Sequence, residues 1–143
     1  MTTERIADQV KFAYWVPNVS GGLVTSTIEQ RTDWNYDYNA KLARTAENNG
    51  FEYALSQVRY EASYGAEYQH ESTSFSLALL LATERLKLIA AVHPGLWQPA
   101  VLAKLGATAD QISGGRFAVN VVSGWFKDEF THLGEPWLEH DER

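Results

Sequence analysis

The alternation of short apolar segments with longer helical patterns is the feature that most limits how this chain can fold. Four segments rich in β-branched and aromatic residues have the length of strands: Lys11–Val16, Phe51–Ser56, Lys87–His93 and Arg116–Val122. Helical patterns lie between them, at Tyr38–Asn49, Glu71–Glu84 and Pro99–Ile112. This βαβαβαβ order predicts an α/β fold with a parallel sheet and right-handed crossovers.

The segment Ser113–Trp125 (SGGRFAVNVVSGW) tells most about function. Gly114 and Gly115 suit the left-handed conformation that ends a helix, and the apolar run that follows contains one polar residue, Asn120. Such a run predicts a parallel strand buried on both faces. A buried amide near the C-terminal end of a strand needs a partner. Asn120 is therefore a candidate ligand contact, with a core amide paired to the backbone as the alternative.

The connecting segments are unequal in length. Helix-to-strand connections are short, whereas the strand-to-helix segments 17–36 and 57–70 are long. Parallel α/β folds place ligands at the C-terminal ends of their strands, so the site is expected there. His93 closes the third strand at that end and either transfers a proton or simply caps the strand. Three tryptophans near the same ends are candidate cavity walls or core residues: Trp15, Trp97 and Trp125.

Composition argues against several other functions. The formal charge of −6, with no block of Lys or Arg, disfavours binding to nucleic acid or to an anionic membrane. The absence of cysteine excludes disulfides and thiolate metal sites, and the four histidines show no paired metal-ligand spacing. No apolar run has the roughly 18 residues of a membrane span, and no leader pattern is present. We expect a cytoplasmic protein without a metal.

The spacing of the strands indicates how much of a larger architecture is present. Each βα unit takes about 30 to 40 residues, and a closed eight-unit barrel takes about 250 residues. The 143 residues are therefore expected to form a single domain, residues 1–143, that holds units one to four of a barrel. A small four-stranded α/β domain is the alternative. Either arrangement leaves sheet edges that favour association with another chain.

Five segments, in chain order, resemble the bacterial luciferase-like, reduced-flavin-dependent monooxygenases, and most of all the branch that acts on dimethyl sulfone. They are FAYWVPNVSGGLV (12–24), GFEYALSQVRY (50–60), WQPA (97–100), GGRFAVNVVSGWFKDEF (114–130) and GEPWLEHDER (134–143). The resemblance covers nearly the whole chain. It implies the N-terminal half of a (β/α)8 TIM barrel of the luciferase-like type.

The resemblance also implies an activity. Members receive reduced FMN from a separate NAD(P)H-dependent FMN reductase and use O2 to oxygenate a small molecule. For this chain it implies conversion of dimethyl sulfone to methanesulfinate and formaldehyde, within a homo-oligomer. The alternatives are an alkanesulfonate or another small substrate, and a truncated flavin-binding or assembly fragment without turnover. The alkanesulfonate enzymes carry a Cys after the second strand, and its absence from this chain favours the sulfone.

The same resemblance assigns five residues to cofactor binding: Val58, Arg59, Asn120, Glu129 and Arg143. Taken without it, Arg59 is better explained as a solvated loop cation, and Glu129 is explained equally well as an acid that stabilises a helix N-terminus. His93 is the catalytic candidate. The residues that act on substrate in the sulfonate branch lie largely beyond the part of the family that this chain matches.

Overall fold

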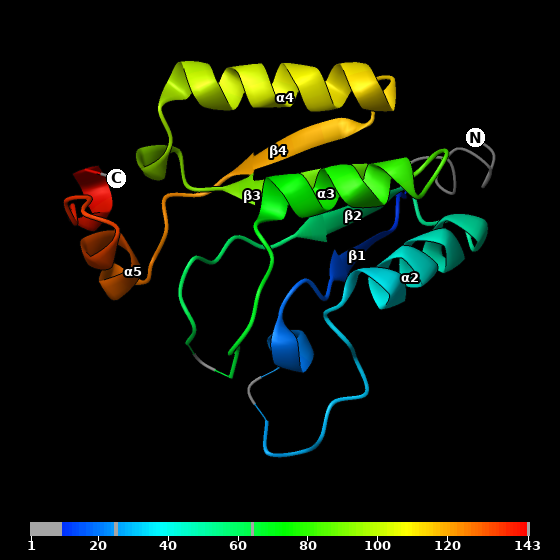
Figure 1. The fold of residues 1–143 in the computed structure, drawn as a ribbon, viewed down its shortest axis with the longest axis horizontal. Coiled ribbons are helices and arrows are strands. Elements are labelled where there is room, and N and C mark those ends of the chain that lie inside the picture. The colour runs from blue at the N-terminus through cyan, green and yellow to red at the C-terminus, as the bar shows by residue number, and fades with distance from the viewer. Residues whose placement is uncertain (1–9, 25, 64, 143) are drawn as a thin grey trace, which may run out of the picture.

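The computed structural model describes residues 10–24, 26–63 and 65–142, and it has the predicted α/β order (Figure 1). The strands are β1 (Ala13–Val16), β2 (Tyr53–Ser56), β3 (Lys87–Val92) and β4 (Phe117–Val121). The helices are α2 (Tyr36–Asn48), α3 (Ser72–Leu81), α4 (Pro99–Ser113) and a short α5 (Lys127–His132). Three 3-10 turns lie at Ser20–Leu23, Pro94–Leu96 and His140–Glu142. The prediction missed α5.

The sheet is parallel throughout, with the order β1-β2-β3-β4. Each strand therefore pairs with the one before it in the chain, as in a parallel barrel built from successive βα units. Within the described residues, β1 and β4 are the two edges. This is the topology of four consecutive strands of a parallel β-barrel.

Local signals set the limits of the helices. The Asn35 side chain accepts a hydrogen bond from the backbone nitrogen of Tyr38 at 2.8 Å, so α2 begins two residues earlier than predicted. The Glu71 carboxylate accepts from the first turn of α3. Gly114 ends α4 with a φ of 67°, which confirms the predicted left-handed glycine.

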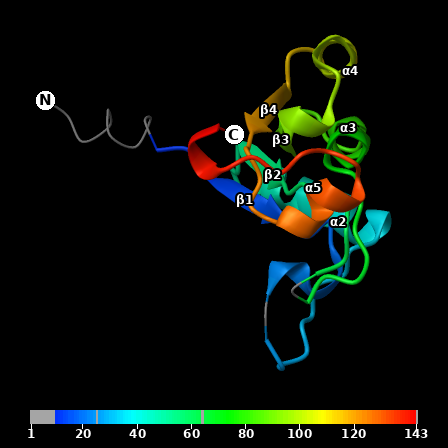
Figure 2. The same cartoon turned by 90° about the vertical axis from the view of Figure 1, so that its left-hand side faces the viewer.

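Helices α2, α3 and α4 cover one face of the sheet (Figure 2). The core lies between that face and the helices, and its fully buried members include Val16, Ala54, Leu79, Leu80 and Leu88. The other face is uncovered among the described residues, and Trp15, which points from β1 to that side, is 55% exposed. One face is thus packed by helices and the other corresponds to the inside of a barrel.

The expectation that β4 is buried on both faces is wrong for the described residues. Val119 and Val121 are 44% and 64% exposed, and Asn120 is half-buried. The reason is that β4 pairs only with β3, and its other edge has no neighbouring strand among the described residues. Helix α4 packs near the start of β4, where Phe117 approaches Gly106.

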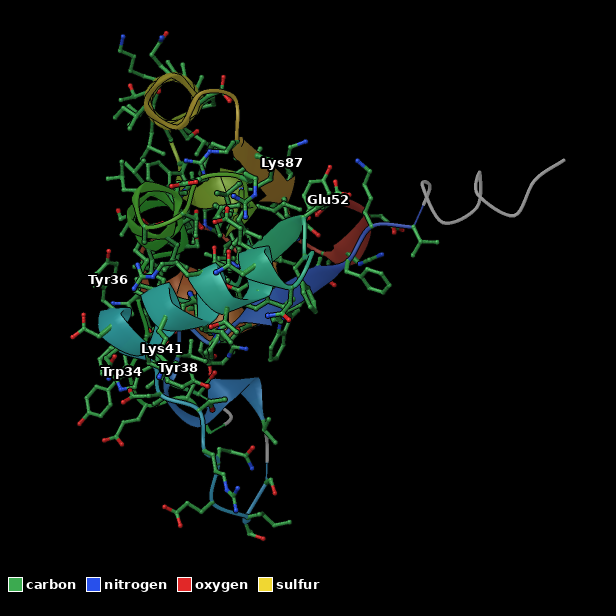
Figure 3. All side chains as sticks on the ribbon, turned by 90° about the vertical axis from the view of Figure 1, so that its right-hand side faces the viewer. Trp34, Tyr36, Tyr38, Lys41, Glu52 and Lys87 are labelled. Atoms are coloured by element: carbon green, nitrogen blue, oxygen red, sulfur yellow. The ribbon has the colours of Figure 1, made fainter. Side chains whose placement is uncertain are left out.

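The end of the sheet where the strands begin is closed by polar contacts. Figure 3 shows Glu52 and Lys87 at this end. The Lys11 ammonium lies 3.0 Å from the Glu52 carboxylate. The Glu47 side chain, at the end of α2, accepts hydrogen bonds from the backbone nitrogens of Glu84, Arg85 and Leu86. It fixes the turn that leads into β3.

Arg116 completes this end of the sheet. Its guanidinium donates to the carbonyl oxygens of Ser113 at 2.9 Å, Leu86 at 3.0 Å and Leu80 at 2.9 Å. It also donates to the Thr83 hydroxyl at 3.3 Å. Arg116 therefore satisfies carbonyls at the ends of α3 and α4 and ties both helices to β4.

Candidate functional site

A pocket of about 500 Å³ lies at the C-terminal ends of the strands, where the loop lengths predict a site. Its volume falls within the range of about 300–1,000 Å³ that is typical of ligand pockets. The structure brings together in this pocket most of the residues named from the sequence: Trp15, Val58, Arg59, His93, Asn120, Trp125 and Glu129. Another hollow, of about 600 Å³, lies among loop residues around Ile28 and contains none of the predicted site residues.

The floor of the pocket is a row of residues across three strands. Asn120 of β4 pairs with Ala91 of β3, and Gln57 directly follows the β2 residue that pairs with Ala90. Two carboxamides therefore flank one small methyl group. Asn120 was expected to be buried, and it is half-buried because it faces the uncovered side of the sheet. This exposure makes its carboxamide accessible from the pocket.

The sequence analysis did not identify Gln57 as a site residue. Gln57 is 8% exposed, and within the described chain its Nε2 has no hydrogen-bond partner. The fully buried Asn18 holds its backbone on both sides, donating to the Gln57 carbonyl at 3.0 Å and accepting from the Gln57 nitrogen at 3.3 Å. The signal that could have found Gln57 is a polar residue directly after an apolar strand, two positions beyond Leu55 on the same face of the sheet.

An aromatic wall surrounds Arg59. Its guanidinium carbon lies 4.9 Å from the centre of a ring of Trp125 and 5.8 Å from that of Phe126. It also donates a hydrogen bond to the Ser63 hydroxyl. Stacking of this kind holds a cation over flat aromatic faces. Trp15 and Trp125 line the pocket as predicted, whereas Trp97 lies outside it and donates to the Tyr60 hydroxyl at 3.2 Å.

His93 and Glu129 form a buried pair beside the pocket. The two side chains are 7% and 2% exposed, and His93 Nε2 lies 3.5 Å from Glu129 Oε2. His93 Nδ1 faces the Val122 carbonyl oxygen at 3.1 Å. Each ring nitrogen thus faces an oxygen atom of the protein.

The second carboxylate oxygen of Glu129 accepts from the backbone nitrogens of Tyr60 and Glu61. Burial alone would raise the pKa of the Glu129 carboxyl, but the hydrogen bonds from His93 and from these two amides lower the pKa below its ordinary value. Glu129 therefore carries its negative charge and joins α5, the end of β3 and the loop after β2. We call this arrangement the Glu129 clamp.

The Glu129 clamp contains two residues with predicted roles, Glu129 in flavin binding and His93 in proton transfer. Both oxygens of Glu129 and both ring nitrogens of His93 already have protein neighbours. Direct flavin contact by Glu129 and proton transfer by His93 therefore stay predictions, and the contacts present show only positioning. Arg143 lies outside the described residues.

Among the described residues, no group of three or more His, Asp or Glu side chains is arranged to hold a metal ion. None of the described helices combines the length and the apolar character needed to cross a membrane.

The fold and the strand-end pocket define a member of a barrel family. The sequence matches the luciferase-like monooxygenase family over residues 10–143, and the chain belongs to this family. Its four βα units are the N-terminal half of the (β/α)8 TIM barrel that the resemblance implied. The EDTA monooxygenase from Chelativorans sp. BNC1 has the same fold, with a TM-score of 0.76 at 18% identity over 93% of this chain and 33% of that one.

Two curated relatives are much more similar in sequence. The chain is 68% identical over 138 residues to the FMNH2-dependent dimethylsulfone monooxygenase of Pseudomonas putida, covering 96% of this chain and 38% of the relative. It is 69% identical over 134 residues to the enzyme of the same name from Pseudomonas fluorescens (strain Pf0-1), covering 94% and 37%. The chain thus spans less than two fifths of the length of these relatives.

The pocket residues fit a flavin ring system. A flavin has a flat, apolar face and an edge of polar nitrogen and oxygen atoms, so it needs aromatic walls and a few fixed hydrogen-bonding groups. Trp15, Trp125 and Phe126 supply such walls. Asn120 offers both a donor and an acceptor, and the unpartnered Gln57 Nε2 offers a further donor.

Proposed function

We propose that this chain supplies the first four βα units, and the pocket described above, to the oxygenase of a two-component flavin system. The reaction consumes dimethyl sulfone, O2 and reduced FMN and yields methanesulfinate, formaldehyde, oxidised FMN and water. The observation that carries the proposal is the 68% identity to a relative named for this substrate and cofactor, over 96% of the chain. The residues that line the pocket lie within the matched region, so the similarity to that relative includes the pocket.

The residues of the pocket have distinct tasks in this proposal. When bound, reduced FMN supplies the two electrons that let O2 oxygenate the substrate. Asn120 and Arg59 hold polar atoms of the flavin, and Val58 packs against it. The aromatic walls at Trp15 and Trp125 keep water away from the reaction, which suppresses wasteful release of hydrogen peroxide. A small neutral sulfone needs few charges around it, and the pocket lining contains one Arg and one Glu, Arg59 and Glu129.

The Glu129 clamp has a positioning task. It anchors the backbone at Tyr60 and Glu61, directly after Val58 and Arg59, to the end of β3. The flavin-contacting loop is thereby fixed before the ligand arrives, which lowers the entropy cost of binding. The proposed partners are an NAD(P)H-dependent FMN reductase and further copies of the same protein, and the proposed compartment is the cytoplasm, where NAD(P)H is supplied.

Formaldehyde release tests the proposal. The full-length protein is incubated with an FMN reductase, NADH, FMN, O2 and dimethyl sulfone, with catalase added to remove free peroxide. Formaldehyde is expected only when both the reductase and the sulfone are present. Sulfite release from alkanesulfonates, with no formaldehyde from dimethyl sulfone, would move the assignment to the sulfonate-type reaction.

A further inference from the structure

The carboxamide of Gln57 presents an unusual polar group at the wall of the pocket. The residue is 8% exposed and lines the pocket, yet its Nε2 has no hydrogen-bond partner within the described residues. A buried N–H donor without a partner is disfavoured, because it has lost its water and gained nothing in exchange. Such a group in a pocket wall calls for an acceptor that the pocket's occupant brings.

Other unpartnered amide atoms in the described chain differ in kind and in place. They are the carbonyl oxygens of Asn39 and Gln69, and neither residue lines the pocket. Under-satisfied carbonyl oxygens are more common in proteins than unpaired N–H groups. Among these three amides, Gln57 is therefore the one whose unpartnered atom is least well explained by packing alone.

The position of Gln57 is fixed before any ligand binds. Asn18 is completely buried and hydrogen-bonds to both the nitrogen and the carbonyl oxygen of Gln57. The same Asn18 also donates to the His70 carbonyl at 3.4 Å, which ties the ends of the long loop after β2 together. A residue held on both sides presents its side chain in a defined direction, as a specific contact requires.

Gln57 also matches Asn120 in register. Gln57, directly after β2, and Asn120, on β4, lie on either side of Ala91 of β3, so their backbones are about 10 Å apart at the usual strand spacing. Ala91 lines the pocket between the two carboxamides, and its side chain is a single methyl group. A planar ligand lying across Ala91 meets one amide at each side.

We propose that Gln57 is a ligand contact of this pocket, which donates its Nε2–H to an acceptor oxygen of the occupant. This inference rests on the proposed function, in which two oxygens have the required chemistry: a carbonyl oxygen of the flavin ring and a sulfonyl oxygen of the substrate. Gln57 and Asn120 then act as a pair that sets the orientation of the occupant relative to the sheet.

The test uses two variants in the full-length protein. Gln57→Glu keeps the size of the side chain but, at neutral pH, replaces the donor with an acceptor. Gln57→Leu removes both polar atoms. The matched control is Gln69→Leu, which removes another amide with a buried unpartnered atom, away from the pocket. The measurements are the Kd for FMN by fluorescence quenching, the KM for dimethyl sulfone, and the Tm without ligand.

A contact with the flavin raises the Kd for FMN by about 5- to 50-fold in both Gln57 variants, as expected for a lost donor to a buried acceptor. A contact with the sulfone raises KM to a similar extent and leaves the Kd for FMN unchanged. Unchanged Kd and KM, with a Tm for Gln57→Leu that rises as in the control, would show a purely structural amide and overturn the proposal.

The FMN titration does not depend on turnover. If the wild-type protein binds FMN but releases no formaldehyde, the proposed function fails while the flavin arm of this experiment is still decisive.

Discussion

Glu129 Oε2 lies 3.5 Å from His93 Nε2, while the other oxygen of the same carboxylate accepts from two backbone amides of the loop after β2. One buried charge therefore connects three segments that are distant in the sequence. Because α5 supplies that charge, the short helix after β4 determines where the loop that carries Arg59 lies.

Replacing Glu129 with Gln tests the clamp. The charge is lost while the size of the side chain is kept, so the hydrogen bonds to His93 and to the loop amides weaken. We expect the free energy of unfolding to fall by about 1–3 kcal/mol and the Kd for FMN to rise several-fold. Urea unfolding and an FMN titration measure these effects. Asp128→Asn, an exposed neighbour on α5, is the control, and equal effects of the two variants would refute the clamp.

Glu47 predicts a dependence of stability on pH. Burial raises the pKa of the Glu47 carboxyl, but the amides of Arg85, Leu86 and Glu84 and the charge of Arg85 together lower it below the ordinary value. A lowered pKa in the folded state contributes stability above the unfolded-state value of about 4.3, and this stability is lost as the pH falls through the folded value. Wild type and Glu47→Gln should therefore differ most at neutral pH and converge in acid.

Denaturant unfolding at a series of pH values measures this difference. The control is Glu84→Gln, whose side chain is 87% exposed, and it should follow wild type at every pH. A gap between wild type and Glu47→Gln that widened in acid would show that the folded-state pKa of Glu47 is raised instead of lowered.

Asn120→Ala tests the polar contact on β4. If Asn120 holds the flavin edge, its loss leaves a ligand atom unpaired and weakens FMN binding by about 1–3 kcal/mol, or roughly 5- to 150-fold in Kd. The Tm should change little, because Asn120 is half-buried on an edge strand. Unchanged affinity in an FMN titration would remove Asn120 from the site.

Ala91→Leu tests the shape of the pocket floor. A larger side chain between Gln57 and Asn120 fills the space in which the proposed flavin lies, so FMN binding should be lost or reduced by at least about tenfold. Ala107→Leu, on an exposed position of α4, is the control and should bind FMN normally. Calorimetric titration with FMN measures both. Normal binding by the Ala91 variant would place the flavin elsewhere.

Arg116→Lys separates stability from binding. Lysine keeps the charge but lacks the guanidinium geometry that reaches three carbonyls at once. We expect unfolding to require about 1–3 kcal/mol less free energy, while the Kd for FMN stays the same because Arg116 lies at the opposite end of the sheet from the pocket. Loss of FMN affinity at unchanged stability would contradict this division.

The sequence was sufficient for the order of the four strands and of α2, α3 and α4, and for the end of the sheet that holds the pocket. Apolar runs and glycine signals are local properties, so β3 was predicted to within one residue and the end of α4 at Gly114 was correct. Val58 and Arg59 were named from the family resemblance and Asn120 also from its place on the strand, and the parallel topology brings the three to one pocket at the C-terminal ends of the strands. Their contact with FMN stays a prediction.

Long-range contacts were not predictable in this way. The burial of Glu129 depends on His93 and on a loop far away in the sequence, and no local pattern indicates either neighbour. The exposure of Val121 follows from the position of β4 at the edge of the described sheet, which is a property of the whole topology. Gln57 is distinguished by a buried Nε2 without a partner among the described residues, which is a property of the folded chain and of no local sequence pattern.

The strand order β1-β2-β3-β4 has a consequence for how the protein is made. Each new strand pairs with the strand synthesised just before it, so the sheet can grow while the chain leaves the ribosome, and each pairing closes only one βα unit. The edge formed last, at β4, is then open to association, and so is the edge at β1 among the described residues. Val121 is 64% exposed and Trp125 is 60% exposed there. A pause in translation after β4 would therefore expose apolar side chains beside an unpaired strand edge, the kind of surface that chaperones bind.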